Sequence, residues 1–134
     1  MKASITEIKV RGYHADLYGH VNHARYLELL EEARWNYFES SANLEEFHSR
    51  GWVFLIVNIN INYRKPAVPG DTLQIHTSYK AHSSRSMTIH QKVQLNGTET
   101  MVADADITFV VMDTQTGKVL TLEGRLLEML LGPA

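Results

Sequence analysis

The sequence predicts an α+β fold in which an antiparallel β-sheet wraps around one long central helix. Two observations predict it: only one long segment of the 134 residues has helical periodicity, and most of the remaining chain alternates apolar and polar residues as strands do. A single helix with an apolar stripe cannot bury that stripe alone, so the sheet is expected to curve around it. No repeat, low-complexity tract or linker divides the chain, and residues 1–134 are therefore expected to form one domain.

The first strand and the long helix come from the N-terminal third of the chain. Residues 5–10 alternate, with Ile8 and Val10 on one face, as in a strand with one solvated side. Residues 22–39 change to helical spacing, and Asn22 is the expected N-cap because its side chain can accept from the free amides of the first turn. A short helical turn is expected over residues 44–50. The stripe of the long helix consists of Leu27, Leu30, Arg34 and Tyr37, widened by Leu29 and Ala33.

The rest of the chain is mostly strand. Residues 52–63 begin apolar on both faces and end in strict alternation, before prolines and a glycine terminate the pattern. Further strands are expected at residues 72–79, 87–95 and 101–112, and the last two are separated by the hairpin signal Asn-Gly. After a turn, residues 119–122 are expected to pair again and residues 123–131 to form a closing helix.

Composition limits the classes of function. Charged residues make up 21% of the chain and the formal net charge is −2, so no basic face is available for nucleic acid phosphates. The longest apolar run, residues 52–57, is too short to cross a bilayer, and residues 1–10 lack the apolar block of a signal peptide. There is no cysteine, which excludes disulfides, thiolate metal sites and a cysteine nucleophile and favours a reducing cytosol as the location.

Residues 13–23 join the first strand to the long helix and carry the most distinctive chemistry. Asp16 lies one loop before the helix start, where unpaired backbone N–H groups and the positive end of the helix dipole are expected. A thioester carbonyl at that position would be polarised, and Asp16 could attack it or activate a water. Gly19 would let the backbone approach closely. Taken alone, an Asp in a loop is more often a turn or capping residue.

Three histidines in the same segment suggest a metal site, but their spacing matches no zinc pattern and no cysteine accompanies them. We therefore expect the imidazoles of His14, His20 and His23 to be hydrogen-bonded or solvated, and we expect no metal there. No glycine-rich phosphate loop, Gly-x-Ser-x-Gly elbow or dinucleotide fingerprint is present.

Two further polar groups could contact a substrate. The loop of residues 83–86 holds three serines and Arg85, which could bind a phosphate or simply form a polar hairpin loop. The pair Arg64-Lys65, before Pro66, is equally ambiguous.

Several segments resemble a known family. They are residues 10–16 (VRGYHAD), 20–28 (HVNHARYLE), 31–35 (EEARW) and 57–68 (VNININYRKPAV), and residues 103–110 agree as well. The pattern is similar to the hotdog-fold 4-hydroxybenzoyl-CoA thioesterase family, and most of all to its bacterial long-chain acyl-CoA thioesterase III branch, which is linked to β-oxidation. The resemblance covers about 120 residues, and motifs combined over that length are specific.

The resemblance implies roles for individual residues. Asp16 matches the catalytic aspartate, and the backbone N–H of His23 matches the amide that polarises the thioester carbonyl. Tyr26 and Arg64 also lie in the matching segments. Together with the loop of residues 83–86, they form the expected substrate-binding set. The loop residues that match the holders of the CoA phosphates are Ser83, Ser84, Arg85 and Ser86, although some relatives carry a denser basic cluster there. Family members form dimers, often paired into tetramers, with active sites at the subunit interface.

The resulting expectation is an acyl-CoA thioesterase that releases a free fatty acid and CoA. It needs no metal or organic cofactor, CoA being part of the substrate, and acts as a cytoplasmic homodimer or homotetramer. Two alternatives stay open: a hotdog 3-hydroxyacyl thioester dehydratase, whose usual signature is not found, and a non-catalytic acyl-CoA binding protein. The sequence does not fix acyl chain length or unsaturation, CoA versus acyl carrier protein, or nucleophilic attack versus general-base action by Asp16.

Overall fold

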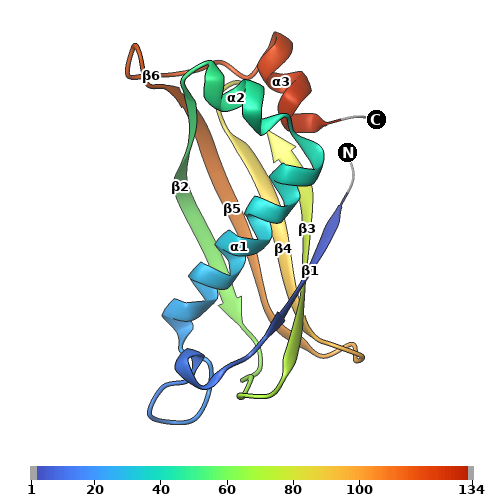
Figure 1. The fold of residues 1–134 in the computed structure, drawn as a ribbon. Helices are drawn as coiled ribbons and strands as arrows, with labels where there is room; N and C mark the ends of the chain where they lie inside the picture. The colour runs from blue at the N-terminus through green and yellow to red at the C-terminus, as the bar shows by residue number, and fades with distance from the viewer. Residues whose placement is uncertain (1–2, 133–134) are drawn as a thin grey trace.

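One curved sheet and one long helix make up most of the computed structural model, which describes residues 3–132 apart from the side chain of Ser41 (Figure 1). The predicted domain spans residues 1–134, so its first two and last two residues lie outside the described part. The strands are β1 (Ser4–Lys9), β2 (Trp52–Tyr63), β3 (Thr72–His82), β4 (Met87–Leu95), β5 (Met101–Asp113) and β6 (Lys118–Val119). The helices are the 3-10 turn η1 (Gly12–His14), α1 (His23–Ser41), α2 (Leu44–Ser49) and α3 (Gly124–Leu131).

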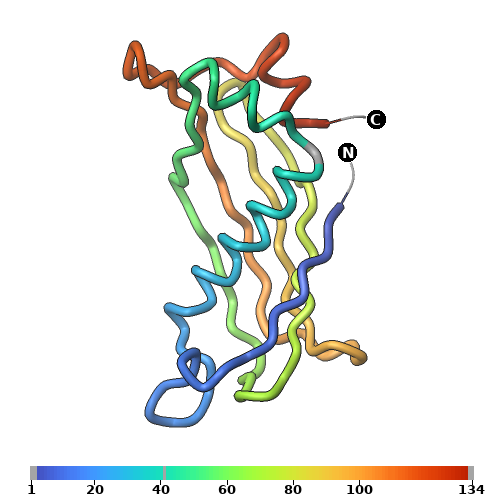
Figure 2. The backbone as a smooth tube through the Cα atoms, in the orientation of Figure 1, coloured from blue at the N-terminus to red at the C-terminus, as the bar shows by residue number. Residues whose placement is uncertain are grey.

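The sheet is antiparallel throughout, with strand order β1-β3-β4-β5-β2, and the short β6 pairs with the end of β5. α1 crosses the concave face of this sheet (Figures 1 and 2). The predicted hotdog arrangement, a sheet around one long helix, is confirmed. The expected pairing at residues 119–122 is only partly found: β6 ends at Val119, although the Leu120 amide still donates to the Val111 carbonyl of β5 at 2.8 Å, and the Leu122 amide donates instead to the Ser84 carbonyl at 2.7 Å. None of the helices in residues 3–132 is both long enough and apolar enough to span a membrane.

The core lies between α1 and the inward side chains of the central strands. Leu30, Ala33 and Tyr37 of α1 are fully buried against the sheet, as predicted. Leu27 was expected in the same stripe, but its side chain is 40% exposed. The buried stripe passes instead through Tyr26, because residues 26, 30, 33 and 37 follow the helical repeat toward the sheet.

A β-bulge in the edge strand β2 changes which side chains face α1. The pairing with β5 skips Val57, so that Ile56 lies opposite Phe109 and Asn58 lies opposite Thr108. Before the bulge the even-numbered Phe54 and Ile56 face the helix side, and after it the odd-numbered Ile59 and Ile61 pack on the core. An extra residue shifts the two-residue repeat of a strand by one position. The bulge therefore explains why the inward positions change from even to odd numbers along β2.

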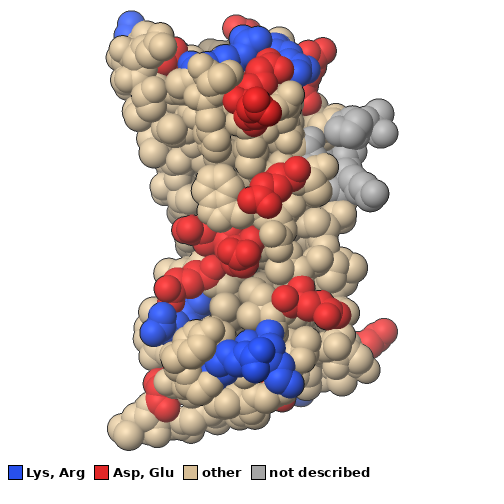
Figure 3. Space-filling view, in the orientation of Figure 1, with Lys and Arg blue, Asp and Glu red and all other residues tan. Residues whose placement is uncertain are grey.

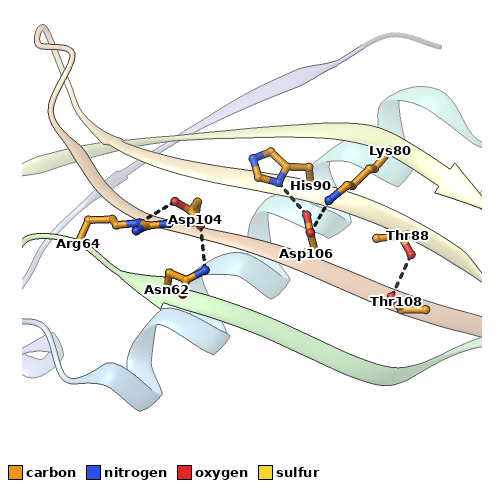
Figure 4. A network of polar contacts seen from close by, with 8 residues as sticks. All are labelled: Asn62, Arg64, Lys80, Thr88, His90, Asp104, Asp106 and Thr108. Carbon is orange, nitrogen blue, oxygen red and sulfur yellow. Dashed lines mark hydrogen bonds and ion pairs between the residues drawn. The ribbon is translucent and has the colours of Figure 1, made fainter.

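The outer face of the sheet carries neighbouring groups of polar contacts (Figure 4). The Lys80 ammonium and the His90 ring contact the two oxygens of Asp106, at 2.5 and 2.8 Å. The hydrogen bond from Lys80 is the main reason that the pKa of Asp106 lies below its usual value. Next to this group, Asn62 and Arg64 both donate to Asp104. The alternation in β2, β4 and β5 thus separates a polar outer face from an apolar inner one.

Candidate active site

The loop between β1 and α1 is folded back on itself by backbone hydrogen bonds. The Asp16 amide donates to the His20 carbonyl at 2.9 Å, and the Gly19 amide donates to the Asp16 carbonyl at 3.0 Å. Gly19 has a φ of 77°, in the left-handed region that favours glycine. The Val21 amide then donates to the Ala67 carbonyl at 2.9 Å, which fixes the loop against the segment that follows β2. This closed loop holds Asp16 next to the start of α1.

Asn22 connects Asp16 to the helix start. Its side-chain oxygen accepts from the Ala24 amide at 2.9 Å, which is the predicted N-cap. Its side-chain NH₂ donates to Asp16 Oδ2 at 3.4 Å. The other carboxylate oxygen, Oδ1, accepts from the Tyr18 amide at 2.9 Å, so Asp16 also has the capping role of an ordinary loop Asp. One of its oxygens is thereby directed toward the first turn of α1.

The first amide of α1 is available to a ligand. Within residues 3–132, the backbone N–H of His23 has no hydrogen-bond acceptor, as expected for the first helical position. The carbonyl of the same residue accepts from the Tyr63 hydroxyl at 3.0 Å, so the end of β2 holds the helix start in place. A free N–H at the positive end of the helix dipole is suited to a carbonyl oxygen that gains negative charge.

An open cleft of about 350 Å³ lies over these groups. Asp16, His23, Tyr26 and Tyr63 border it, and the rings of Tyr26 and Tyr63 meet edge to face at 5.5 Å. Burial raises the pKa of Tyr26 to about 12 and also raises that of Tyr63, so both hydroxyls are protonated near neutral pH. The cleft therefore combines one carboxylate, one free amide and two neutral hydroxyls.

Two cations border the same cleft. Arg64, predicted to bind substrate, lies there but is held by Asp104, to which its Nε donates at 2.9 Å. Lys65 also borders the cleft and has no ion pair within residues 3–132. Sequence reasoning did not select Lys65, and it missed the contact of Tyr63 with α1. Position 63 continues the inward series of Ile59 and Ile61, a signal that could have placed Tyr63 on the helix side.

The structure does not bring the loop of residues 83–86 near Asp16 within one chain. The loop is closed by a hydrogen bond between the hydroxyls of Ser83 and Ser86, at 2.7 Å, and the Leu122 amide donates to the Ser84 carbonyl. Arg85 is exposed on it. β3 begins at the Asp16 end of the sheet and ends at this loop, and its 11 residues span roughly 35 Å. Figure 1 shows the two loops at opposite ends of the fold.

The three histidines of the loop have different surroundings. His14 is buried, and its Nδ1 accepts from the Arg11 amide at 2.8 Å, while burial lowers its pKa. His20 and His23 border the cleft instead. In the part of the chain that the structure describes, no group of three His, Asp or Glu side chains is arranged to hold a metal ion.

Comparisons with known proteins identify the family of the chain. The family model of the thioesterase-like superfamily matches residues 10–130. The chain is 50% identical over 125 residues to the long-chain acyl-CoA thioesterase FadM of Escherichia coli K12, covering 93% of this chain and 95% of that protein. It superposes on the crystal structure of the probable thioesterase YbaW of E. coli with a TM-score of 0.89 and 49% identity, over 94% and 95% of the two chains. The Staphylococcus aureus protein SAV2348, solved in complex with CoA, shares the fold at a TM-score of 0.86 and 10% identity, over 99% and 87%.

Proposed function

The chain belongs to the thioesterase-like superfamily of thioester hydrolases, and we propose that it hydrolyses long-chain acyl-CoA to a free fatty acid and CoA. One observation carries the proposal: Asn22 links Asp16 to the start of α1, where the His23 amide is free, and the acid and the amide border one cleft. The substrate named for the E. coli relative supports a long-chain acyl-CoA as the substrate here.

In the proposed reaction the thioester carbonyl oxygen accepts from the His23 N–H. As the carbonyl carbon becomes tetrahedral, the negative charge on its oxygen is stabilised by that N–H and by the helix dipole. Asp16 supplies the attack, either directly through a carboxylate oxygen or by removing a proton from a water. The C–S bond then breaks and CoA leaves as its thiolate, which takes up a proton. If a water attacked, this step yields the fatty acid; if Asp16 attacked, it leaves a mixed anhydride that a water then hydrolyses to the fatty acid and free Asp16.

The acyl chain is proposed to lie along the side of α1 that faces β2. The two elements run side by side in opposite directions, with ring contacts between Tyr26 and Tyr63 at one end and between Trp35 and Phe54 at the other. Each methylene removed from water there would contribute about 0.8 kcal/mol. The outer face of α1 is unsuited to CoA phosphates because it is acidic (Figure 3), with exposed Glu28, Glu31, Glu32 and Glu39.

We propose that the second edge of β2 pairs with the same strand of another copy. β2 is at the end of the sheet, and Leu55, Ile56 and Val57 are exposed at its middle. Antiparallel pairing would give hydrogen-bond partners to the unpaired backbone groups of this edge. It would also place the second copy in the opposite direction, so that each end of one sheet lies beside the other end of its partner. The partner's loop of residues 83–86 would then lie at the Asp16 end, which allows Arg85 to contact the CoA phosphates of the neighbouring site.

Sedimentation at several concentrations tests this assembly. A dimer, or a tetramer built from it, is expected, and a monomer at micromolar concentration would contradict it.

A reducing cytosol is the proposed location, because the chain lacks cysteine.

Replacing Asp16 by Asn tests the proposed role of the carboxylate. Release of free thiol from palmitoyl-CoA and shorter acyl-CoAs should fall by about 10²- to 10⁴-fold, the usual contribution of a positioned acid–base group. Asp113→Asn is the matched control, because Asp113 also accepts from the amide two residues ahead, at 2.8 Å, but lies at the far end of the sheet. Full activity in Asp16→Asn would exclude the mechanism, and tight binding without thiol release by the native protein would favour a binding protein.

A single turnover in isotopically labelled water distinguishes the two forms of attack. If water attacks, the label enters the fatty acid in the first turnover. If Asp16 attacks and a water then opens the mixed anhydride at the Asp16 carbonyl, the first fatty acid is unlabelled and the label appears in Asp16, so label in Asp16 identifies the covalent route.

A further inference from the structure

Two tyrosines border the cleft beside Asp16, and the chain itself uses only one of their hydroxyls. The Tyr63 hydroxyl donates to the His23 carbonyl at 3.0 Å. A hydroxyl has one hydrogen to donate, so Tyr63 cannot also donate to a ligand. Within residues 3–132 the Tyr26 hydroxyl takes part in no hydrogen bond. Tyr26 therefore carries the free hydroxyl of the cleft.

The ring of Tyr26 is buried, but its oxygen is not sealed into the core. The residue as a whole is only 3% exposed. Among the described residues, its hydroxyl oxygen is nevertheless not one of the side-chain atoms that are both fully buried and without a partner. Because the oxygen has no partner, it must keep some accessible surface, and the cleft is the open space that Tyr26 borders. A polar group at the end of a buried side chain is a usual contact for a ligand.

The position of this hydroxyl is fixed by packing. The Tyr26 ring meets the Tyr63 ring edge to face at 5.5 Å, and it belongs to the same buried stripe of α1 as Leu30 and Ala33. A ring held in the core leaves its hydroxyl little freedom beyond rotation about the C–O bond. Such a preorganised donor needs no reorientation during a reaction.

Helix geometry brings the hydroxyl toward the free amide of His23. Residues 23 and 26 are three positions apart, so their side chains lie about 60° apart around the helix and about 4.5 Å apart along its axis. Helical side chains tilt toward the N-terminus, so the Tyr26 side chain extends back over the first turn. The His23 N–H points out of the same end of α1. Both groups border the cleft that Asp16 also borders.

We propose that the Tyr26 hydroxyl donates a hydrogen bond to the carbonyl oxygen of the bound thioester, beside the His23 amide. This inference rests on the proposed function and adds a second donor to it. Donors lie about 2.7–3.1 Å from the oxygen that they stabilise, so two donors about 5 Å apart can serve one atom. The contact strengthens as the oxygen gains negative charge, and the hydroxyl keeps its hydrogen throughout.

The protonation state of Tyr26 suits this role. Burial raises the pKa of Tyr26 to about 12, so the hydroxyl is a neutral donor near pH 7. A second negative charge beside the Asp16 carboxylate would repel the developing oxyanion, and a neutral hydroxyl avoids that repulsion.

Pairing of two copies along β2 is compatible with this donor. The ring is already enclosed by its own chain, so a partner is not needed to bury it. The hydroxyl is reached through the cleft beside Asp16 and His23, and a substrate has to enter that cleft in the assembled protein too. The proposal is therefore made for the assembled protein, which is the form used in the experiments.

Replacing Tyr26 by Phe keeps the buried ring and removes only the oxygen. For palmitoyl-CoA, kcat should fall about 10²-fold, the usual loss for one such donor. KM should change less than about threefold, because the contact acts mainly in the transition state. Tyr37→Phe is the matched control: Tyr37 is buried farther along the same helix, its pKa is also raised to about 12, and its loss should leave kcat and KM unchanged. A fall in kcat of less than about tenfold in Tyr26→Phe would overturn the proposal.

Two unreactive analogues of palmitoyl-CoA show which part of the ligand the hydroxyl contacts. In the ketone, a methylene replaces the sulfur and the carbonyl is kept; in the thioether, a methylene replaces the carbonyl. Tyr26→Phe should weaken binding of the ketone about fivefold, as for one neutral hydrogen bond, and leave binding of the thioether unchanged. Equal changes for the two ligands, or none, would refute a contact with the carbonyl oxygen.

Sedimentation and thermal unfolding of Tyr26→Phe test a purely structural role. Both should match the native protein, because no hydrogen bond of the chain is lost. Weaker assembly would show that the hydroxyl binds the partner copy instead, and a lower Tm would show a contact within the fold; either result would overturn the proposal.

The same assays separate this inference from the proposed function. Thiol release by the native protein that is undiminished in Tyr26→Phe would refute only the inference. If the native protein binds the ketone more tightly than the thioether, Tyr26→Phe removes that difference and no thiol is released, only the proposed hydrolysis would be refuted.

Discussion

Replacing Asn22 separates two roles that this residue combines. Its oxygen caps α1 through the Ala24 amide, and its NH₂ donates to Asp16. Asn22→Ala removes both contacts, whereas Asn22→Ser keeps an oxygen for the cap and removes the donor to Asp16. The first variant should lose stability and activity, and the second should lose activity alone.

The expected magnitudes follow from these contacts. Loss of the cap costs about 1 kcal/mol. With an unfolding entropy of about 0.28 kcal/mol/K for 134 residues, this lowers Tm by about 3–4 °C. The 3.4 Å contact with Asp16 is long, so we take about 1 kcal/mol for it, below the usual contribution of a bond to a charged group. If the whole of this energy stabilises the transition state, its loss lowers kcat/KM about fivefold in both variants.

Calorimetry and thiol-release kinetics measure the two effects independently. Asn22→Ser should keep Tm within about 1 °C of the native value, since serine caps helices as well as asparagine does. Its kcat/KM should nevertheless match that of Asn22→Ala. Native activity in Asn22→Ser would refute the positioning role, and so would a loss in both variants that merely follows the unfolded fraction.

Three other predictions concern the cleft, the core and the outer face. Tyr63→Phe removes the donor to the His23 carbonyl and should lower kcat/KM about fivefold with an unchanged circular dichroism spectrum; an unaltered rate would contradict the role of the hydroxyl. Phe109→Ala empties a fully buried position and should cost about 3–5 kcal/mol in urea unfolding, so a loss below about 1 kcal/mol would show that the core is not packed as described. The pKa of Asp106 is held below 3.8, chiefly by the hydrogen bond from Lys80, so its contribution to stability is present above that value and is lost as the pH falls through the lower folded-state pKa. In Asp106→Asn the urea midpoint should therefore decline less between pH 5 and pH 2 than in the native protein, and equal declines would refute this origin.

Much of the fold could be predicted because each element has its own period in the sequence. β2 begins and ends at the predicted residues, and α1 begins one residue after the predicted cap. The exact buried stripe of α1 could not be predicted, because Leu27 is apolar but 40% exposed, whereas the neighbouring Tyr26 is buried. The spacing of apolar residues along a helix indicates which face is apolar, but it does not indicate how much of that face the sheet covers.

Part of the candidate site could also be predicted, because some of its residues are close together in the sequence. Asp16, Asn22 and His23 lie within eight residues, so one loop and one helix start suffice to bring them together. Tyr63 comes from a strand 40 residues away, and Arg34 meets Gln91 across 57 residues. Contacts of that kind depend on strand register, which a single sequence specifies only weakly.

The skipped position at Val57 makes the effect of a deletion in β2 depend on which residue is removed. Deleting Val57 would make the ladder with β5 regular and would leave every face unchanged, because Ile56 and Asn58 already lie opposite the consecutive residues Phe109 and Thr108. Deleting Leu55 with the bulge kept would instead exchange the two faces for residues 52–54, so that Phe54 would turn outward and Val53 would take its place beneath α1. All of these side chains are hydrophobic, so a hydropathy profile would scarcely distinguish the two deletions. Only the second would destroy the aromatic stack, even though every aromatic residue would still be present in the chain.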